Sequence, residues 1–216
     1  MKHYNFLLGE FVESDTNKHA DWSGNKRSSF SIIGASNHSD TDRQSDDFYA
    51  TDPNAIDYLL SVAKLSNNLW ECACGAGDLS KRLISFGYNV KSTDLVYRGF
   101  GQGGVNFLTC TEKFDGDILT NPPYKYAQEF VEHALELVPL GRKVFMFLKL
   151  TFLEGKSRRR LFDTGQLKCV YVFSSRIICA KNGDFEEARK LGSAVAYAWF
   201  EFEHGYIGDA SIKWLP

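Results

Sequence analysis

The sequence is poor in the residues that build metal centres, disulfide frameworks and membrane spans. Its five cysteines are odd in number and show no paired C-x-x-C spacing, which argues against a zinc site. A chain of 216 residues can bury a sizeable core without disulfides. No signal peptide and no apolar run long enough to span a bilayer are found. These absences predict one cytoplasmic domain without metal or membrane contact.

Histidine clusters and a strong positive charge are also missing. The five histidines are scattered, and none forms the pattern of a Ser-His-Asp hydrolase. The formal net charge is −2, so no overall field attracts a polyanion. One basic cluster, residues 156–160, follows the apolar run 144–148 and is expected near the carboxyl edge of a sheet. We interpret Lys156, Arg158 and Arg159 as candidate phosphate contacts; a solvated helix start is the alternative.

The most informative stretch is Asn121-Pro122-Pro123-Tyr124, which follows an apolar pair of residues. Two prolines cannot continue a strand because each lacks a hydrogen-bond donor, so these residues are expected to project from the carboxyl end of a strand. Open α/β sheets bind ligands there. The Asn121 oxygen and the Pro122 carbonyl can each accept one hydrogen of a planar NH₂ group. The Tyr124 ring offers a stacking face.

A second motif lies about fifty residues earlier and combines a short apolar run, a glycine turn and a helix start. Gly75 and Gly77 permit a tight turn and close approach to a ligand, and Asp78 or Ser80 is expected to cap the helix. Ser80 also occupies the place of the third glycine in a dinucleotide-binding fingerprint. The sequence therefore argues against a nicotinamide-dependent dehydrogenase.

Together the two motifs resemble those of S-adenosylmethionine-dependent amino-methyltransferases, and their order resembles the gamma class of these enzymes. The whole pattern is similar to small uncharacterised methyltransferases of bacterial and phage genomes. The resemblance implies S-adenosylmethionine as cofactor and transfer of its methyl group to N6 of adenine in DNA. It assigns catalysis to Asn121, Pro122, Pro123 and Tyr124.

The resemblance also implies a cofactor-binding set drawn from several segments. Glu71 would face the ammonium group of the cofactor, Asp94 would accept the ribose hydroxyls, and Leu95 would cover the adenine ring. Asn106 stands where the family usually has an acid that receives the cofactor's amine. The full set is Tyr49, Thr51, Glu71, Cys72, Ala73, Gly75, Gly77, Asp78, Leu79, Asp94, Leu95, Asn106, Phe107 and Asn121.

Several alternatives stay open at this point. Access of a duplex adenine requires base extrusion, and Phe152 or Phe173 would stack on it opposite Tyr124, unless both belong to the core. An RNA adenine or a protein glutamine amide presents a similar planar NH₂ group. Because Asn106 replaces the usual acid, it also stays open that the protein is not catalytic and only binds cofactor or nucleic acid.

The layout predicts an α/β fold of the Rossmann-like class I methyltransferase type. We expect a doubly wound, mostly parallel seven-stranded sheet with an antiparallel pair, 167–173 and 193–202, at its end. Residues 1–47 are expected to form a polar leader or lid, and residues 48–216 the methyltransferase domain. No segment is large enough for a target-recognition domain, which leaves a homodimer or a separate specificity partner open. The expected helices are 53–65, 78–86 and 127–138, and the other strands are 69–72, 89–94, 105–108, 115–120 and 142–149.

Overall fold

The computed structural model describes residues 2–5, 10–13, 49–181, 186 and 195–216, and the chain divides into two units. In the first unit, Met1–Asn37, strands β1 (Lys2–Asn5) and β2 (Glu10–Glu13) form an antiparallel pair. The rest of the predicted leader, and with it the lid, lies outside the described residues. The second unit, His38–Pro216, holds all the other elements described below.

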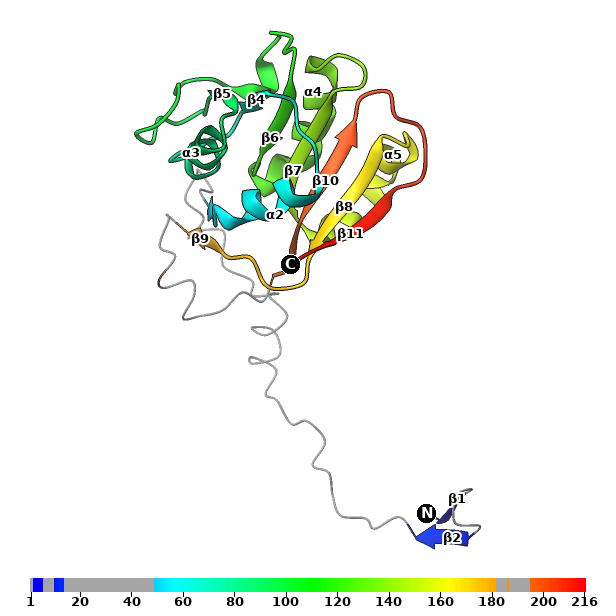
Figure 1. Ribbon diagram of the computed structural model, residues 1–216. Coiled ribbons are helices and arrows are strands. Elements are labelled where there is room, and N and C mark those ends of the chain that lie inside the picture. The colour runs from blue at the N-terminus through cyan, green and yellow to red at the C-terminus, as the bar shows by residue number, and fades with distance from the viewer. Residues whose placement is uncertain (1, 6–9, 14–48, 182–185, 187–194) are drawn as a thin grey trace, which may run out of the picture. The chain divides into compact units, whose positions relative to one another are not determined.

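A seven-stranded sheet forms the centre of the second unit, with the order β11-β8-β10-β7-β6-β4-β5 (Figure 1). Only β10 runs antiparallel to its neighbours, β7 and β8; the other described pairs in this sheet are parallel. The predicted mostly parallel sheet and its antiparallel pair, β8 with β10, are therefore confirmed. The strands are β4 (Asn68–Glu71), β5 (Asn89–Ser92), β6 (Asp117–Thr120), β7 (Lys143–Lys149), β8 (Leu167–Phe173), β10 (Tyr197–Glu203) and β11 (Ser211–Leu215).

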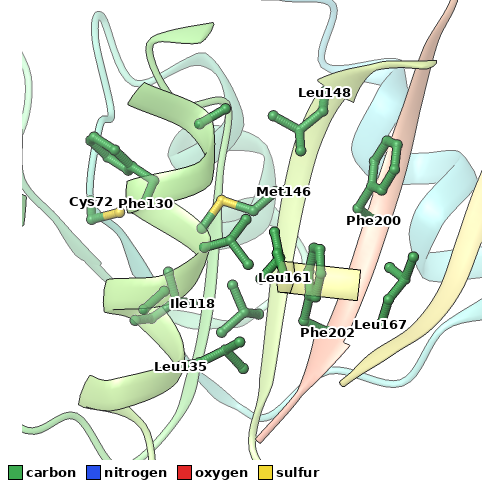
Figure 2. Close-up of a cluster of buried hydrophobic side chains, with 14 of the residues drawn as sticks. Cys72, Ile118, Phe130, Leu135, Met146, Leu148, Leu161, Leu167, Phe200 and Phe202 are labelled. Atoms are coloured by element: carbon green, nitrogen blue, oxygen red, sulfur yellow. The ribbon is translucent and has the colours of Figure 1, made fainter. Parts of the chain in front are cut away.

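Helices cover both faces of this sheet. Helices α4 (Ala127–Leu137) and α5 (Arg159–Asp163) contribute to one apolar cluster, in which α4 packs on β6, β7 and β10 (Figure 2). Helices α2 (Asn54–Val62) and α3 (Asp78–Ser85) contribute to the cluster on the other face. The central strands are consequently buried on both sides, and β7 accordingly carries an unbroken apolar run between its two terminal lysines.

The residue before the N-cap stabilises the start of α2. The Asp52 carboxylate accepts a hydrogen bond from the backbone N–H of Asn54 at 3.0 Å, which satisfies one of the free donors of the first turn. Pro53, next to it, has the helical φ of −54° that a proline ring favours. The short strand β3 (Tyr49–Thr51) lies directly before this helix in the chain.

Several features differ from the predicted layout. The expected strand 105–108 is a short 3-10 helix, η2 (Phe107–Thr109), because the Asn106 side chain accepts from the backbone of Leu108 and caps a helical turn. The seventh strand is instead β11, which lies at the opposite edge of the sheet beside β8. β3 pairs with a second unexpected strand, β9 (Cys179–Lys181), in a separate two-stranded sheet.

In the described part of the chain, no helix has the length and hydrophobicity of a membrane span. The same part of the chain holds no group of three or more His, Cys, Asp or Glu side chains arranged to bind a metal ion.

Candidate active site

The two sequence motifs follow neighbouring strands. β4 and β6 are parallel partners, and their register pairs Trp70 with Ile118, so Cys72 and Thr120 stand at the same level at the carboxyl edge. The Cys72 thiol lies against the Thr120 hydroxyl, and burial raises the pKa of this thiol. The glycine turn and the Asn-Pro-Pro-Tyr turn therefore emerge side by side.

The glycine turn is tied to the end of the next strand, β5. The backbone N–H of Cys74 donates to the Thr93 carbonyl at 3.0 Å, and that of Gly75 donates to the Asp94 carboxylate at 2.8 Å. The other Asp94 oxygen accepts from the backbone of Val96 at 2.9 Å. Gly75 has φ +54°, a conformation that favours glycine. Asp94 thus shapes the turn and also stands at the predicted strand end.

The beginning of α3 corrects the predicted cap. Gly77, with φ +84°, is the N-cap residue, and no side chain caps the helix. Ser80 is fully buried and points inward, where its hydroxyl donates to the Glu71 carboxyl and lies 2.6 Å from the Ser92 hydroxyl. A serine in place of the fingerprint's third glycine thus serves an internal hydrogen-bond network.

Glu71 is buried beneath the glycine turn rather than exposed at the edge. Its side chain is 2% exposed, and desolvation raises its pKa to about 8, partly offset by the hydrogen bonds from Ser80. At neutral pH most of this group carries a proton. The free protein therefore does not present Glu71 as the open carboxylate that the predicted ion pair with an ammonium group requires.

Other members of the predicted cofactor set lie on both sides of the turn. Leu95 is 58% exposed next to Asp94, which suits an apolar cover for a planar ring. Asn106 is exposed, and its side-chain oxygen caps η2. Phe107 is 2% exposed and packs edge-on against Trp70. The burial of the Phe107 ring favours a packing role for this residue.

Three predicted cofactor residues, Ala73, Asp78 and Leu79, belong to the glycine segment itself. Ala73 and Leu79 contribute to the packing of the two apolar clusters. Asp78 opens α3, and burial raises the pKa of its carboxyl. The backbone of Tyr49 pairs with Lys181 at the start of β3.

Asn121 contacts a residue that is seventy positions away in the sequence. Its side-chain Nδ2 donates to the Thr51 hydroxyl oxygen at 2.9 Å, and Thr51 is 2% exposed on β3. This bond fixes the orientation of the amide. Its nitrogen is directed to Thr51, so its carbonyl oxygen must point away from Thr51. Pro122 is buried next to it, and the extended backbone of Pro123 leads into the 3-10 helix η3 (Tyr124–Tyr126). The sequence-predicted amide is therefore oriented by tertiary structure.

Tyr124 has contacts from three segments. Its hydroxyl lies 3.7 Å from the Cys179 thiol, and its ring is 6.0 Å from that of Tyr197, tilted by 30°. The ammonium of Lys149 lies 4.9 Å from the Tyr124 ring centroid. Burial raises the pKa of Tyr124 well above its usual value and that of Cys179 to about 11. Both groups are protonated at neutral pH.

The two predicted base-stacking phenylalanines lie within aromatic clusters. Phe152, 8% exposed, packs edge-on against Phe162 and Phe200. Phe173, 9% exposed, packs edge-on against Tyr58 and Phe147. These contacts favour the core alternative for both rings, since each is enclosed by its neighbours.

The basic cluster is only partly available for phosphate. The Arg158 guanidinium donates to the Phe152 carbonyl at 2.8 Å and to the Glu154 carbonyl, so it stabilises the short 3-10 helix η4 (Leu150–Leu153). Arg159 pairs with Asp163 on α5 at 2.6 Å. Lys156 is exposed in the 3-10 helix η5 (Lys156–Arg158). Arg158 is therefore a structural cation.

Three residues near the motifs were not predicted. Lys149 and Tyr197 are register partners on β7 and β10. Lys149 could have been predicted as a site residue, because it stands at the carboxyl end of the expected strand 142–149. Phe100 lies against Gly77 so closely that a Cβ there would be 2.2 Å from its ring. No local pattern links Phe100 to Gly77, because the loop between them returns to the glycine turn only in the folded chain.

The Phe100 contact predicts a specific effect of substituting Gly77. Gly77→Ala is expected to lower the free energy of unfolding by about 2 to 4 kcal/mol, from its left-handed backbone and from overlap with the Phe100 ring. Gly87→Ala is the matched control, because Gly87 has φ +89° and no atom within 4 Å of an added Cβ. Gly87→Ala should lower the free energy of unfolding by about 1 to 2 kcal/mol. Urea denaturation measures both; equal losses would contradict the Phe100 contact.

Comparison with known proteins identifies the fold. No protein-family model and no curated protein matches the sequence. Protein 1320 of Thermoplasma acidophilum is 14% identical, with 70% of this chain and 85% of that chain covered and a TM-score of 0.50. A modification subunit assigned to a type I restriction enzyme of Vibrio vulnificus is 14% identical, with 79% and 47% covered and a TM-score of 0.52. The type IIG restriction endonuclease BpuSI is 14% identical, with 94% and 32% covered and a TM-score of 0.51.

These matches concern architecture only. At such identities a likeness shows a common fold, and it agrees with the predicted Rossmann-like α/β fold of class I methyltransferases. This chain spans less than half of the modification subunit and about a third of the endonuclease.

Proposed function

We propose that this protein is an S-adenosylmethionine-dependent methyltransferase that acts on the exocyclic N6 amine of adenine in DNA. One observation carries the proposal: the Asn121 amide is held by Thr51 at 2.9 Å, on a turn that emerges beside the Gly75 turn. A planar acceptor is thus oriented next to a glycine turn that ends a neighbouring parallel strand. This is the place at which open α/β sheets bind ligands.

The chemistry of the amine explains the residues of this turn. The lone pair of an adenine amine is delocalised into the ring, and accepting both of its hydrogens in hydrogen bonds draws the nitrogen toward tetrahedral geometry. The Asn121 side-chain oxygen accepts one of these hydrogens and the Pro122 carbonyl accepts the other. Tyr124 supplies a face for the base. The proton that leaves the nitrogen after transfer passes to solvent, because the neutral Asn121 amide is too weak a base to keep it.

The residues on the Gly75 side of the glycine turn fit the proposed cofactor. S-adenosylmethionine supplies an electrophilic methyl group on a sulfonium. A carboxylate has about four acceptor sites, so Asp94 can accept ribose hydroxyls while it holds Gly75 and Val96. The exposed Leu95 suits the adenine ring. The Gly77 side is covered by Phe100, so we assign the cofactor to the Gly75 side.

The choice of DNA draws support from two structural neighbours. One is described as a modification subunit assigned to a restriction enzyme and the other as a restriction endonuclease. Both descriptions concern those proteins and not this chain. They favour DNA over an RNA adenine or a protein glutamine amide, which the site geometry alone does not separate. A homodimer or a specificity partner is compatible with the proposal.

Nucleoside mass spectrometry tests the proposal directly. DNA from a host that expresses the wild-type chain is expected to contain N6-methyladenine, and DNA from a host that expresses Asn121→Ala is not. Total RNA and glutamine-containing peptides from the same cells provide the comparison for the other substrates. Methylation confined to RNA or protein would reject DNA as substrate. Binding of S-adenosylmethionine without any product would favour a non-catalytic protein. If S-adenosylmethionine does not bind, methyltransferase activity on any of these substrates is rejected.

The contact between Asn121 and Thr51 predicts an effect on turnover. Thr51→Val keeps the shape of the side chain but removes the hydroxyl, so the amide loses its orientation. We expect kcat to fall about tenfold, which corresponds to one neutral hydrogen bond. Thr51→Ser retains the hydroxyl and should restore most of kcat. The affinity for S-adenosylmethionine, measured by calorimetry, should change little; a loss confined to that affinity would assign Thr51 to the cofactor instead.

A further inference from the structure

Lys149 is the last residue of β7 and stands beside the proposed base-binding turn. β7 pairs with β6 up to Met146, opposite Thr120, and continues for three more residues to Lys149. It therefore extends past the point at which β6 gives way to the turn. On its other side Lys149 is the register partner of Tyr197 on β10.

The ammonium of Lys149 lies over an aromatic ring. Its Nζ is 4.9 Å from the Tyr124 ring centroid, within the range of a cation–π contact. Its charge also acts on the nearby Cys179 thiol, whose pKa it lowers in opposition to the larger effect of burial. Among the described residues, none of the ion pairs between a basic group and a carboxylate involves Lys149.

This position overlaps with the space that a stacked base needs. Stacked aromatic rings have centroids about 4.5 to 7 Å apart, so a base on the same face of Tyr124 would displace an ammonium at 4.9 Å. The four-carbon stem of lysine is flexible, and its compact charge remains fully hydrated or seeks an anion. A nucleotide that brings a base to Tyr124 also brings its own phosphates within reach of that stem.

The three arginines of the basic cluster are already engaged. Arg158 is bound by backbone carbonyls, Arg159 pairs with Asp163, and Arg160 lies 3.7 Å from a Glu132 oxygen. Lys149 is thus a cation in direct contact with the catalytic turn and with no carboxylate partner in the described part of the chain.

We propose that Lys149 occupies the Tyr124 face in the free protein and, when the target base enters, moves to a backbone phosphate next to that nucleotide. The inference rests on the proposed function and deepens it, because it assigns a residue that contacts the phosphate backbone of the substrate. A glutamine amide carries no phosphate and would leave the displaced ammonium without a partner.

A thermodynamic cycle tests the contact. The probes are a short oligonucleotide with one adenine among thymidines, single-stranded or paired, and the same oligonucleotide with neutral methylphosphonate linkages on both sides of the adenine. Fluorescence anisotropy gives their affinities for the wild type and for Lys149→Met, which keeps an unbranched stem without charge. Lys149→Met is expected to weaken binding of the natural oligonucleotide about tenfold and that of the methylphosphonate form by less than twofold. Lys149→Arg should retain most of the affinity.

Salt dependence supplies an independent readout. Removing one phosphate contact should reduce the slope of log affinity against log salt concentration by about 0.7 for single strands or 0.9 for duplex. Lys125→Met is the matched control, since Lys125 is exposed on the same turn with its ammonium 5.2 Å from the Tyr126 ring. Its effect should be the same for both oligonucleotides. The wild-type comparison of the two probes needs no variant, so a variant that fails to fold leaves the test intact.

The outcomes separate this inference from the proposed function. If the wild type methylates DNA but the effects of Lys149→Met and of the neutral linkages are additive, the phosphate contact is wrong and the function stands. If the wild type binds neither oligonucleotide and methylates only a peptide amide, both are wrong. Equal affinity of the wild type for the two probes also overturns the contact.

Discussion

Replacing Asn121 by alanine is expected to lower kcat for methyl transfer by about 10³-fold, the size of effect seen when one preorganised hydrogen-bonding group is removed from a transition state. The variant loses the acceptor that holds one hydrogen of the amine, and the Thr51 hydroxyl loses the hydrogen bond from the Asn121 amide. The affinity for S-adenosylmethionine should change by less than about threefold, because Asn121 acts on the amine that receives the methyl group. Tritiated-methyl incorporation into unmethylated DNA measures the rate, and calorimetry measures the affinity.

Two further variants make this result specific. Asn121→Asp keeps an acceptor oxygen and can accept a hydrogen bond from the Thr51 hydroxyl, so its loss of kcat should be clearly smaller than that of the alanine variant. Asn89→Ala removes an exposed amide that bonds to Asn68 at the opposite end of the sheet, and its kcat should equal that of the wild type. A kcat of Asn121→Ala within tenfold of the wild type would remove Asn121 from the mechanism.

The free energy of unfolding is expected to fall by about 4 to 5 kcal/mol between pH 4.5 and pH 8 because of Glu71 alone. Burial raises the pKa of this carboxyl from 4.5 to about 8 in the folded protein. Within this interval the unfolded chain has lost the Glu71 proton and the folded chain retains it. Stability therefore decreases as pH rises, with a slope of up to about 1.4 kcal/mol per pH unit. Below and above the interval Glu71 contributes no further dependence.

Glu71→Gln isolates this contribution in urea denaturation at pH 5, 6.5 and 8.5. The variant keeps an oxygen that accepts from Ser80 but does not titrate, so its stability should become more favourable relative to the wild type as pH rises. Asp117, whose pKa burial also raises, titrates in both proteins and cancels in the difference. Glu112→Gln, at an exposed ion pair with Lys91, should leave the wild-type slope unchanged. Parallel pH profiles for the wild type and Glu71→Gln would contradict a buried, protonated Glu71.

The order of elements could be predicted because the local pattern of residues is enough to define them. Helix α4 shows apolar residues at helical spacing, and Phe130, Ala134, Leu137 and Val138 are buried. β8 begins and ends at the predicted residues, since its aromatic and β-branched run has no competing structure. The prediction of a strand at 105–108 was wrong. One local hydrogen bond, from the backbone of Leu108 to the Asn106 side chain, favours a helical turn over an edge strand.

The direction of polar side chains could not be predicted in the same way. Ser80 suits a helix cap by its position, yet it faces Glu71, because its buried side of α3 is covered by β4 and β5. Arg158 belongs to a basic run, yet its guanidinium stabilises backbone carbonyls nearby. In both cases the stronger requirement is to satisfy buried or partly buried polar groups. That requirement depends on neighbours which the chain acquires only on folding.

The sequence by itself determined the alternation of strands and helices, and with it the edge at which the glycine turn and the Asn-Pro-Pro-Tyr turn emerge. Only the tertiary structure decided which groups act on these turns. Thr51 lies seventy residues from the Asn121 amide that it orients, Lys149 reaches the Tyr124 ring from β7, and Phe100 closes the Gly77 side. The physical reason is that secondary structure follows from periodicity along the chain, whereas a site is set by side chains that packing brings together from distant segments.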